Sequence, residues 1–131
     1  MIDQNLPENR IAAVIIACAI EVHRTLGGPG LLERIYEEAL ALELTRRGLR
    51  VERQKHVPVV YKGTTFDAPL VLDMVVEDLV VVENKATTAH NEIFESQLLT
   101  YLRVSGLKLG LLLNFGERRV ADGIHRVVNG L

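Results

Sequence analysis

The sequence predicts an α/β protein in which helices flank a mixed sheet. Two helical segments precede a run of extended segments, and a third helical segment separates the later extended segments. Consecutive strands can pair as hairpins, whereas a strand that follows a helix enters the sheet by a crossover, so this order favours an α/β sandwich. The chain has 131 residues, 48% of them hydrophobic, which is enough for one core, and we expect a single domain over residues 1–131.

The first two elements are predicted to be helices. Residues 8–26 form the first, and "GGPG" at 27–30 breaks it. Residues 31–47 form the second, with Gly48 in the position that ends a helix. Its apolar positions recur at near-helical spacing at Leu32, Ile35, Ala39 and Leu42.

A run of strands is predicted next. β-branched and charged residues alternate over 50–61, and Lys62-Gly63 has the composition of a turn. Apolar strands are expected at 69–76 and 79–86, around "ED".

The last part of the chain is predicted to form one more helix and two more strands. Residues 92–104 return to helical spacing and Gly106 ends that helix. Strands are predicted at 107–115 and around 124–128.

Composition limits the possible functions. The net charge of −2 gives no general attraction to nucleic acid. Two local basic runs are either solvated faces or contact surfaces for phosphate, and they comprise Arg46, Arg47, Arg50, Arg53 and Lys55, then Arg118 and Arg119. The single thiol, Cys18, is expected to be buried, and the apolar run at 11–20 is too short to span a bilayer. A cytoplasmic location is expected.

Charged residues interrupt the two central predicted strands. Asp73 lies within "PLVLDMVVE", and Glu83 and Lys85 end "VVVENK", where alternation places both on one face. A two-residue hairpin loop would send Asp73 and Glu83 to opposite faces, whereas a three-residue loop, 77–79, sets them directly opposite each other. We expect the three-residue loop.

Such charges need partners. A buried unpaired charge costs several kcal/mol, so these groups require a counter-ion, water or a metal. Carboxylate oxygens suit Mg²⁺, and Lys85 would then stabilise charge on a developing phosphorane or orient the attacking water. The alternative is a plain ion-pair cluster of Asp73, Glu83 and Lys85.

These residues resemble a known signature. Asp73 followed by Glu83-Asn84-Lys85 is similar to the D…(D/E)xK motif of the PD-(D/E)XK nuclease superfamily. "GLLERIYE" at 30–37 resembles the motif of the GxxExxYE family within it, and the likeness continues through "ALALELTRRGLRVERQ", "LDMVVEDLVVVENKA" and "QLLTYLRVSGLKLGLLLNFG". The resemblance implies a restriction-endonuclease-like αβββαβ core with an extra N-terminal helix, and DNA cleavage that depends on Mg²⁺ or Mn²⁺.

Site residues follow from the same resemblance. It implies that Asp73 and Glu83 bind metal and that Lys85 is the catalytic lysine. Glu33 matches an additional metal-binding carboxylate, although an acid in a first helical turn is also favourable for any helix. Gln97 and Tyr101 resemble a substrate-binding Q-x-x-x-Y motif, and Tyr101 is alternatively an ordinary core aromatic.

Two positions depart from the family pattern, and the histidines give no clear evidence of a metal site. Leu72 replaces the nominal proline before Asp73, and Asn84 brings a polar group where an apolar residue is more usual. His23 is either a metal ligand or a packed residue near a helix end. The remaining histidines, His56, His90 and His125, show no metal-ligand spacing.

Two functions are compatible with these observations. The first is a divalent-metal-dependent nuclease acting on DNA. The alternative is a catalytically weak or inactive binding or assembly module in a repair or defence complex. The acidic net charge favours this alternative. A homodimer is possible in either case, since pairing would enlarge the DNA-contact area of so small a chain.

Overall fold

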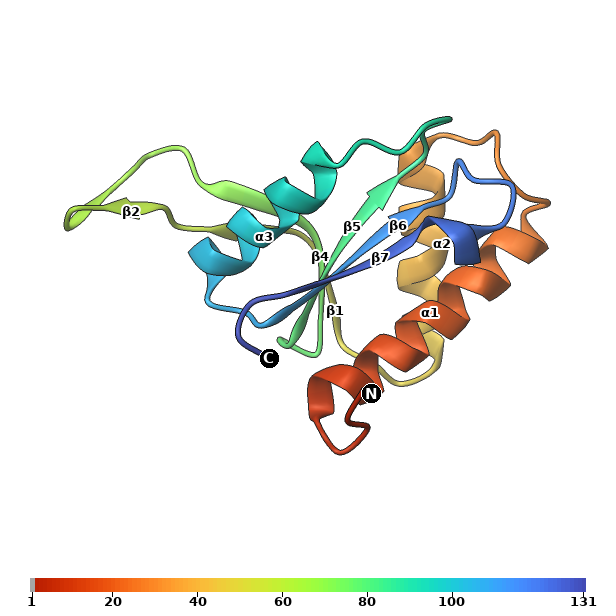
Figure 1. The fold of residues 1–131 in the computed structure, drawn as a ribbon, viewed down its shortest axis with the longest axis horizontal. Coiled ribbons are helices and arrows are strands. Elements are labelled where there is room, and N and C mark those ends of the chain that lie inside the picture. The colour runs from red at the N-terminus through yellow and green to blue at the C-terminus, as the bar shows by residue number, and fades with distance from the viewer. Residues whose placement is uncertain (1) are drawn as a thin grey trace.

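A five-stranded mixed sheet forms the centre of the molecule, with two helices on one face and one on the other (Figure 1). The computed structural model describes residues 2–131. The helices are α1 (Pro7–Thr25), α2 (Glu33–Arg46) and α3 (Ile93–Ser105). The sheet order is β1-β4-β5-β6-β7, formed by Val51–Val57, Leu70–Val76, Val80–Lys85, Leu109–Asn114 and Ile124–Val128. A hairpin of β2 (Val60–Tyr61) and β3 (Thr64–Thr65) and the 3-10 helix η1 (Val120–Gly123) complete the fold, which confirms the predicted α/β class.

The sheet separates two hydrophobic clusters. Side chains of α1 and α2, among them Ile15 and Tyr36, pack with Val80 and Val82 of β5. On the other face, Leu98 and Leu102 of α3 pack with the alternate strand positions Val81 and Leu112. The central strands β5 and β6 are buried on both faces, which explains their continuous apolar sequence.

The connections follow the predicted rule. Strands β1, β4 and β5 pair antiparallel, whereas β5 and β6, joined through α3, are parallel. The last strand, β7, returns antiparallel to β6. Gly106 ends α3 with a φ of 76°, in the left-handed region that glycine adopts without strain.

One predicted strand is shorter than expected. Residues 50–61 do not form one element, because β1 ends at Val57. The next residue, Pro58, has no amide hydrogen to donate to a neighbouring strand. The chain continues into the β2–β3 hairpin, whose turn is Lys62-Gly63 as predicted. This hairpin projects from the body of the molecule (Figure 1).

The β4–β5 hairpin has the three-residue loop that the sequence analysis expected. Val76 pairs with Val80, which leaves residues 77–79 as the loop, and Glu77 and Asp78 both adopt positive φ. The ladder continues to Met74 opposite Val82. The next opposed positions are therefore Asp73 and Glu83.

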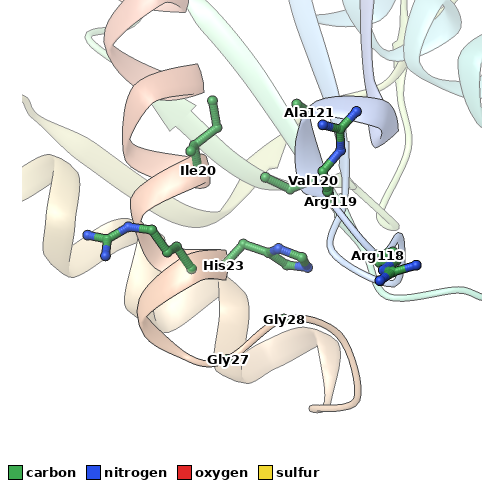
Figure 2. A pocket seen from close by; sticks show the side chains of 9 residues that line it. Ile20, His23, Gly27, Gly28, Arg118, Arg119, Val120 and Ala121 are labelled. Carbon is green, nitrogen blue, oxygen red and sulfur yellow. The ribbon is translucent and has the colours of Figure 1, made fainter.

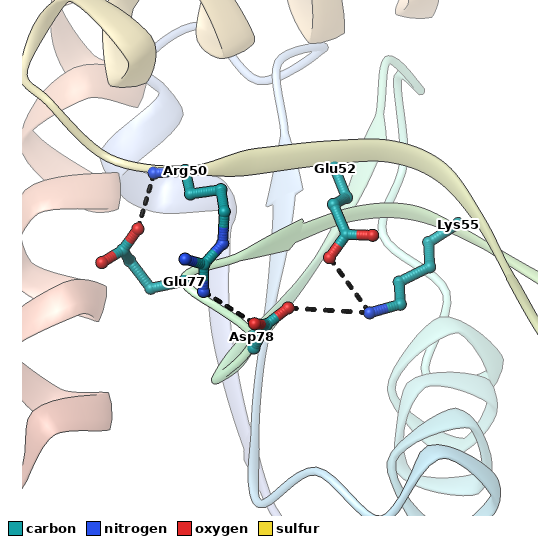
Figure 3. A network of polar contacts seen from close by, with 5 residues as sticks. All are labelled: Arg50, Glu52, Lys55, Glu77 and Asp78. Atoms are coloured by element: carbon teal, nitrogen blue, oxygen red, sulfur yellow. Dashed lines mark hydrogen bonds and ion pairs between the residues drawn. The ribbon is translucent and has the colours of Figure 1, made fainter.

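The first basic run is largely neutralised by neighbouring acids. Arg50 contacts Asp78 at 2.7 Å, and Lys55 lies 3.1 Å from Glu52 and 3.7 Å from Asp78 (Figure 3). Arg47 and Arg53 form ion pairs with acids of α2. These pairs favour the interpretation of this run as a solvated, internally paired face. Within residues 2–131, no helix combines the length and apolar character needed to cross a membrane.

Candidate active site

Asp73 and Glu83 meet where the backbone ladder between β4 and β5 stops. The Asp73 amide lies 3.3 Å from Glu83 Oε1 and donates to it, and the Asn84 amide donates to Asp73 Oδ2 at 2.9 Å. Each carboxylate therefore accepts a hydrogen bond from the opposite strand in place of a backbone carbonyl. The two acids lie side by side, as the hairpin register predicts.

Strand β4 is distorted at Asp73. Leu72 packs in the cluster under α3, whereas Met74 packs in the cluster under α1 and α2, although strict alternation would place both on one face. The ladder to β1 also skips Asp73, opposite Gln54, which has a φ of 50°. Asp73 is thus passed over by the ladder to β1, which resumes at Leu72 opposite Lys55, and it lies just beyond the last ladder pair with β5.

Lys85 is held by the parallel pairing of β5 with β6. Its carbonyl accepts a hydrogen bond of 2.8 Å from the amide of Phe115, just after β6. The buried Asn114 side chain then bridges the exits of both strands, accepting from the amides of Thr87 and Gly116. The Lys85 ammonium lies 4.6 Å from the ring centroid of Phe94 in α3.

Glu33 reaches the same region from the first turn of α2. A hollow of about 520 Å³ is lined by Glu33, Glu37 and Asp73, together with Leu32, Arg34 and Gln54. Burial and then the charge of Asp73 raise the pKa of Glu33, while Lys85 lowers it. Within residues 2–131, Glu33, Asp73 and Glu83 are not all within 4.8 Å of one another, so Glu33 stands apart from the closer pair.

Glu83 is the most strongly perturbed acid. The residue is 7% exposed. Burial, the charge of Asp73 and a hydrogen bond with the Asp73 carboxyl raise the pKa of Glu83 from 4.5 to about 8, against a smaller opposing effect of Lys85. Within residues 2–131, Lys85 forms no ion pair with Asp73 or Glu83, so the plain ion-pair cluster is not the arrangement that the structure shows.

The two α3 residues differ in their environments. Tyr101 is half-buried, and burial together with the charges of Glu83 and Asp73 raises its pKa. Its hydroxyl is thus within electrostatic reach of the two acids. Gln97 is exposed and lies one turn earlier on the same helix face.

Residues beside Glu33 stabilise the entry to α2. The buried Tyr36 hydroxyl donates to the carbonyl of Gly28 at 2.8 Å and accepts from the amide of Leu31 at 3.1 Å. Glu37, 6% exposed, accepts from Arg53 and Gln54 of β1. Glu33, Tyr36 and Glu37, at i, i+3 and i+4, thus combine a candidate site acid with two anchoring residues on one helix face.

His23 is packed and hydrogen-bonded. Its Nε2 lies 3.0 Å from the carbonyl of Phe115, and its ring packs near Tyr36 and Phe115. It also lines a second hollow, of about 500 Å³, whose other side, across from α1, carries Arg118 and Arg119 (Figure 2). The packing alternative for His23 is the one the geometry favours.

One cluster was not predicted from the sequence. The histidines show no metal-ligand spacing along the chain, yet His90, Glu95 and His125 bring their ligand atoms within 4.8 Å of one another. The residues come from the β5–α3 loop, α3 and β7. No local spacing signals this cluster, because only the sheet order and the α3 crossover bring the three segments together.

The family comparison agrees with this architecture. The family model of the PD-(D/E)XK nuclease superfamily matches residues 9–127. The chain therefore belongs to the PD-(D/E)XK nuclease superfamily, and its mixed sheet with flanking helices is consistent with the restriction-endonuclease-like fold, with α1 as the N-terminal helix. Comparison with curated proteins and with solved structures found no match.

Proposed function

We propose that this protein is a divalent-metal-dependent phosphodiesterase acting on DNA, with Asp73 and Glu83 as metal ligands. The observation that supports it most strongly is the pairing of two adjacent carboxylates where the ladder between β4 and β5 stops, with Lys85 on the same strand end. Membership of a nuclease superfamily supports phosphodiester cleavage as the reaction class.

The donor set suits a hard cation. Both candidate ligands offer carboxylate oxygens, and the raised pKa of Glu83 indicates that its ionised form lacks sufficient compensating positive charge. Glu33, which lines the adjoining hollow, would contribute a third carboxylate. Bound Mg²⁺ or Mn²⁺ would supply Lewis acidity to a phosphoryl oxygen.

The chain's own residues account for the remaining requirements. The Lys85 ammonium, on a side chain packed against Phe94, would orient the attacking water or stabilise charge that develops on the phosphoryl group. Tyr101 and Gln97 present a phenol and an amide from α3, groups that can hold a phosphate or a base edge. Each has a fixed place on a helix or strand, which favours precise positioning.

The second hollow supports a nucleic acid substrate. Phe115 links it to the site, because its amide bonds to Lys85 while its carbonyl bonds to His23 of the hollow. Arg24, Arg118 and Arg119 line this hollow, and Arg118 forms no ion pair within residues 2–131, whereas the other two do. The guanidinium of Arg118 is thus available for a backbone phosphate next to the cleavage site.

We also propose that the chain belongs to the GxxExxYE branch of the superfamily. Each residue of that motif has a definable task. Gly30 has a φ of 117°, which other residues rarely adopt, and Tyr36 closes the loop that precedes α2. Glu33 faces the site hollow, and Glu37 ties α2 to β1.

A cleavage assay tests the nuclease proposal. Plasmid DNA and a single-stranded oligonucleotide are incubated with the wild type, Asp73→Asn, Glu83→Gln and Lys85→Met, in Mg²⁺ or Mn²⁺. Each variant is expected to lose cleavage by about 100-fold or more. Asp67→Asn and Lys62→Met change an exposed acid and an exposed lysine in and beside the β2–β3 hairpin, and both should retain wild-type rates.

Thermal melting separates the two candidate functions. Mn²⁺ should raise the melting temperature of the wild type and of Lys85→Met but not of Asp73→Asn, because only the last variant loses a ligand. If Mn²⁺ stabilises the wild type through Asp73 but neither DNA substrate is cleaved, the protein is the metal-binding module without turnover. Wild-type cleavage by Lys85→Met would refute the assignment of the lysine.

A further inference from the structure

A cluster of two histidines and one glutamate lies outside the carboxylate site. His90 comes from the loop between β5 and α3, Glu95 from the first turn of α3, and His125 from the edge strand β7. His90 Nε2 and Glu95 Oε1 are 2.6 Å apart, and the two imidazole rings stack with centroids 4.1 Å apart and planes inclined by 19°. One ligand atom of each residue lies within 4.8 Å of the other two.

We propose that His90, Glu95 and His125 form a second metal site, selective for a borderline transition metal such as Zn²⁺. Two imidazoles and a carboxylate with one position left open is a ligand set typical of Zn²⁺ in proteins. This site is independent of the proposed nuclease function, since it shares no residue with the carboxylate site.

To accept the ion, one imidazole must rotate out of the stack, because each nitrogen lone pair lies in its ring plane and the two nearly parallel rings do not direct theirs at one point. With bonds of about 2.0–2.1 Å, the ligand atoms of a tetrahedral site are about 3.3 Å apart. The 2.6 Å contact of His90 with Glu95 would lengthen, and the ligand atoms of all three residues start no more than 4.8 Å apart. Side-chain rotation provides such shifts, because His90 and Glu95 are partly exposed, with 28% and 38% of their side chains accessible.

The ligand types also separate the two sites chemically. Mg²⁺ prefers oxygen ligands and is held poorly by imidazole, whereas Zn²⁺ binds imidazole well. The carboxylate site therefore favours Mg²⁺ or Mn²⁺, and the histidine site favours Zn²⁺ or Co²⁺. Both kinds of ion can occupy the protein together without competing for the same residues.

The position of the cluster gives the ion a structural role. It would connect the loop that follows Lys85 to the edge strand β7. The Lys85 ammonium lies 4.6 Å from the ring centroid of Phe94, the residue before Glu95. The ion would therefore fix the start of α3 next to the catalytic lysine.

Cobalt absorption tests the site directly. Tag-free protein, stripped of metal with a chelator, is titrated with Co²⁺, whose visible absorption is intense only in a tetrahedral site, and Zn²⁺ is then added to displace it. One Co²⁺ per chain is expected, with affinity reduced at least about tenfold in His90→Gln and in His125→Gln. Zn²⁺ at about 100 times its Kd should raise the melting temperature of the wild type by on the order of 10 °C.

Two controls make the result decisive. His56→Gln removes an exposed histidine of β1 and should bind Co²⁺ like the wild type. The double variant Asp73→Asn/Glu83→Gln should also keep the absorption, even though it would not cleave DNA. The proposal is overturned if His90→Gln, a change at an exposed loop residue, leaves Co²⁺ binding unaltered, or if the double variant abolishes it.

Discussion

Replacing Glu83 by glutamine tests the electrostatic description of the site. The substitution keeps the shape of the side chain but removes a carboxyl whose pKa is raised from 4.5 to about 8. A raised pKa means that the folded protein binds the proton more tightly than the unfolded chain does. The contribution of Glu83 to stability is therefore complete below about pH 4.5, falls as the pH rises and is lost by about pH 8.

The magnitude follows from the size of the shift. Each pKa unit corresponds to about 1.4 kcal/mol, so the wild type without metal should lose up to about 5 kcal/mol of unfolding free energy between about pH 4.5 and pH 8 from this group. Glu83→Gln has no such group and should be the more stable protein at about pH 8.5. Metal binding to the ionised carboxylates should restore the stability of the wild type and should not raise that of Glu83→Gln.

Urea unfolding at several pH values, with chelator and with Mn²⁺, measures this difference. Calorimetry in buffers of different ionisation enthalpy adds a second readout. Near pH 7 a carboxyl with a pKa of about 8 is roughly nine-tenths protonated, so metal binding should release about 0.9 proton from Glu83. Parallel stability curves of wild type and variant, or metal binding at pH 7 without proton release, would refute the reasoning.

Three further substitutions give separate expectations. Asn84→Leu should stabilise the protein by about 1–3 kcal/mol in urea unfolding, because the buried Asn84 Oδ1 has no hydrogen-bond partner among residues 2–131. Gly116→Ala should lower the melting temperature sharply, since its Cβ would lie 2.1 Å from the carbonyl oxygen of Thr87; unchanged melting would contradict this close approach. Arg118→Ala, made in an Asp73→Asn background, should weaken DNA binding equally for all sequences and reduce the salt slope by about 1, measured by fluorescence anisotropy.

Local signals in the sequence located the elements well. The first helix was expected at 8–26 and lies at Pro7–Thr25, and the helix ending at Gly106 was placed within one residue at each end. Glycine and alternating apolar residues act over a few neighbours, so their effect is visible without the fold. The boundary at Pro58 was missed because the alternation continues past the proline.

The relation between Asp73 and Glu83 was also accessible from the sequence. Both residues lie on one hairpin, and the register of a hairpin is fixed by its loop length. A three-residue loop at 77–79 therefore sets the two carboxylates opposite each other. Lys85 follows from alternation along the same strand. The acidic pair is thus encoded within a short segment of chain.

Contacts between distant segments were decided by the tertiary structure alone. The hydrogen bond from His23 to the carbonyl of Phe115 joins positions 92 residues apart, and the pairing of Arg53 with Glu37 neutralises a charge that looked free in the sequence. The meeting of His90 with His125 requires both the α3 crossover and the addition of β7 to the sheet. Hydrophobic periodicity specifies which face of each element is buried, but it does not specify which polar side chains then come together, because that depends on how all the elements pack.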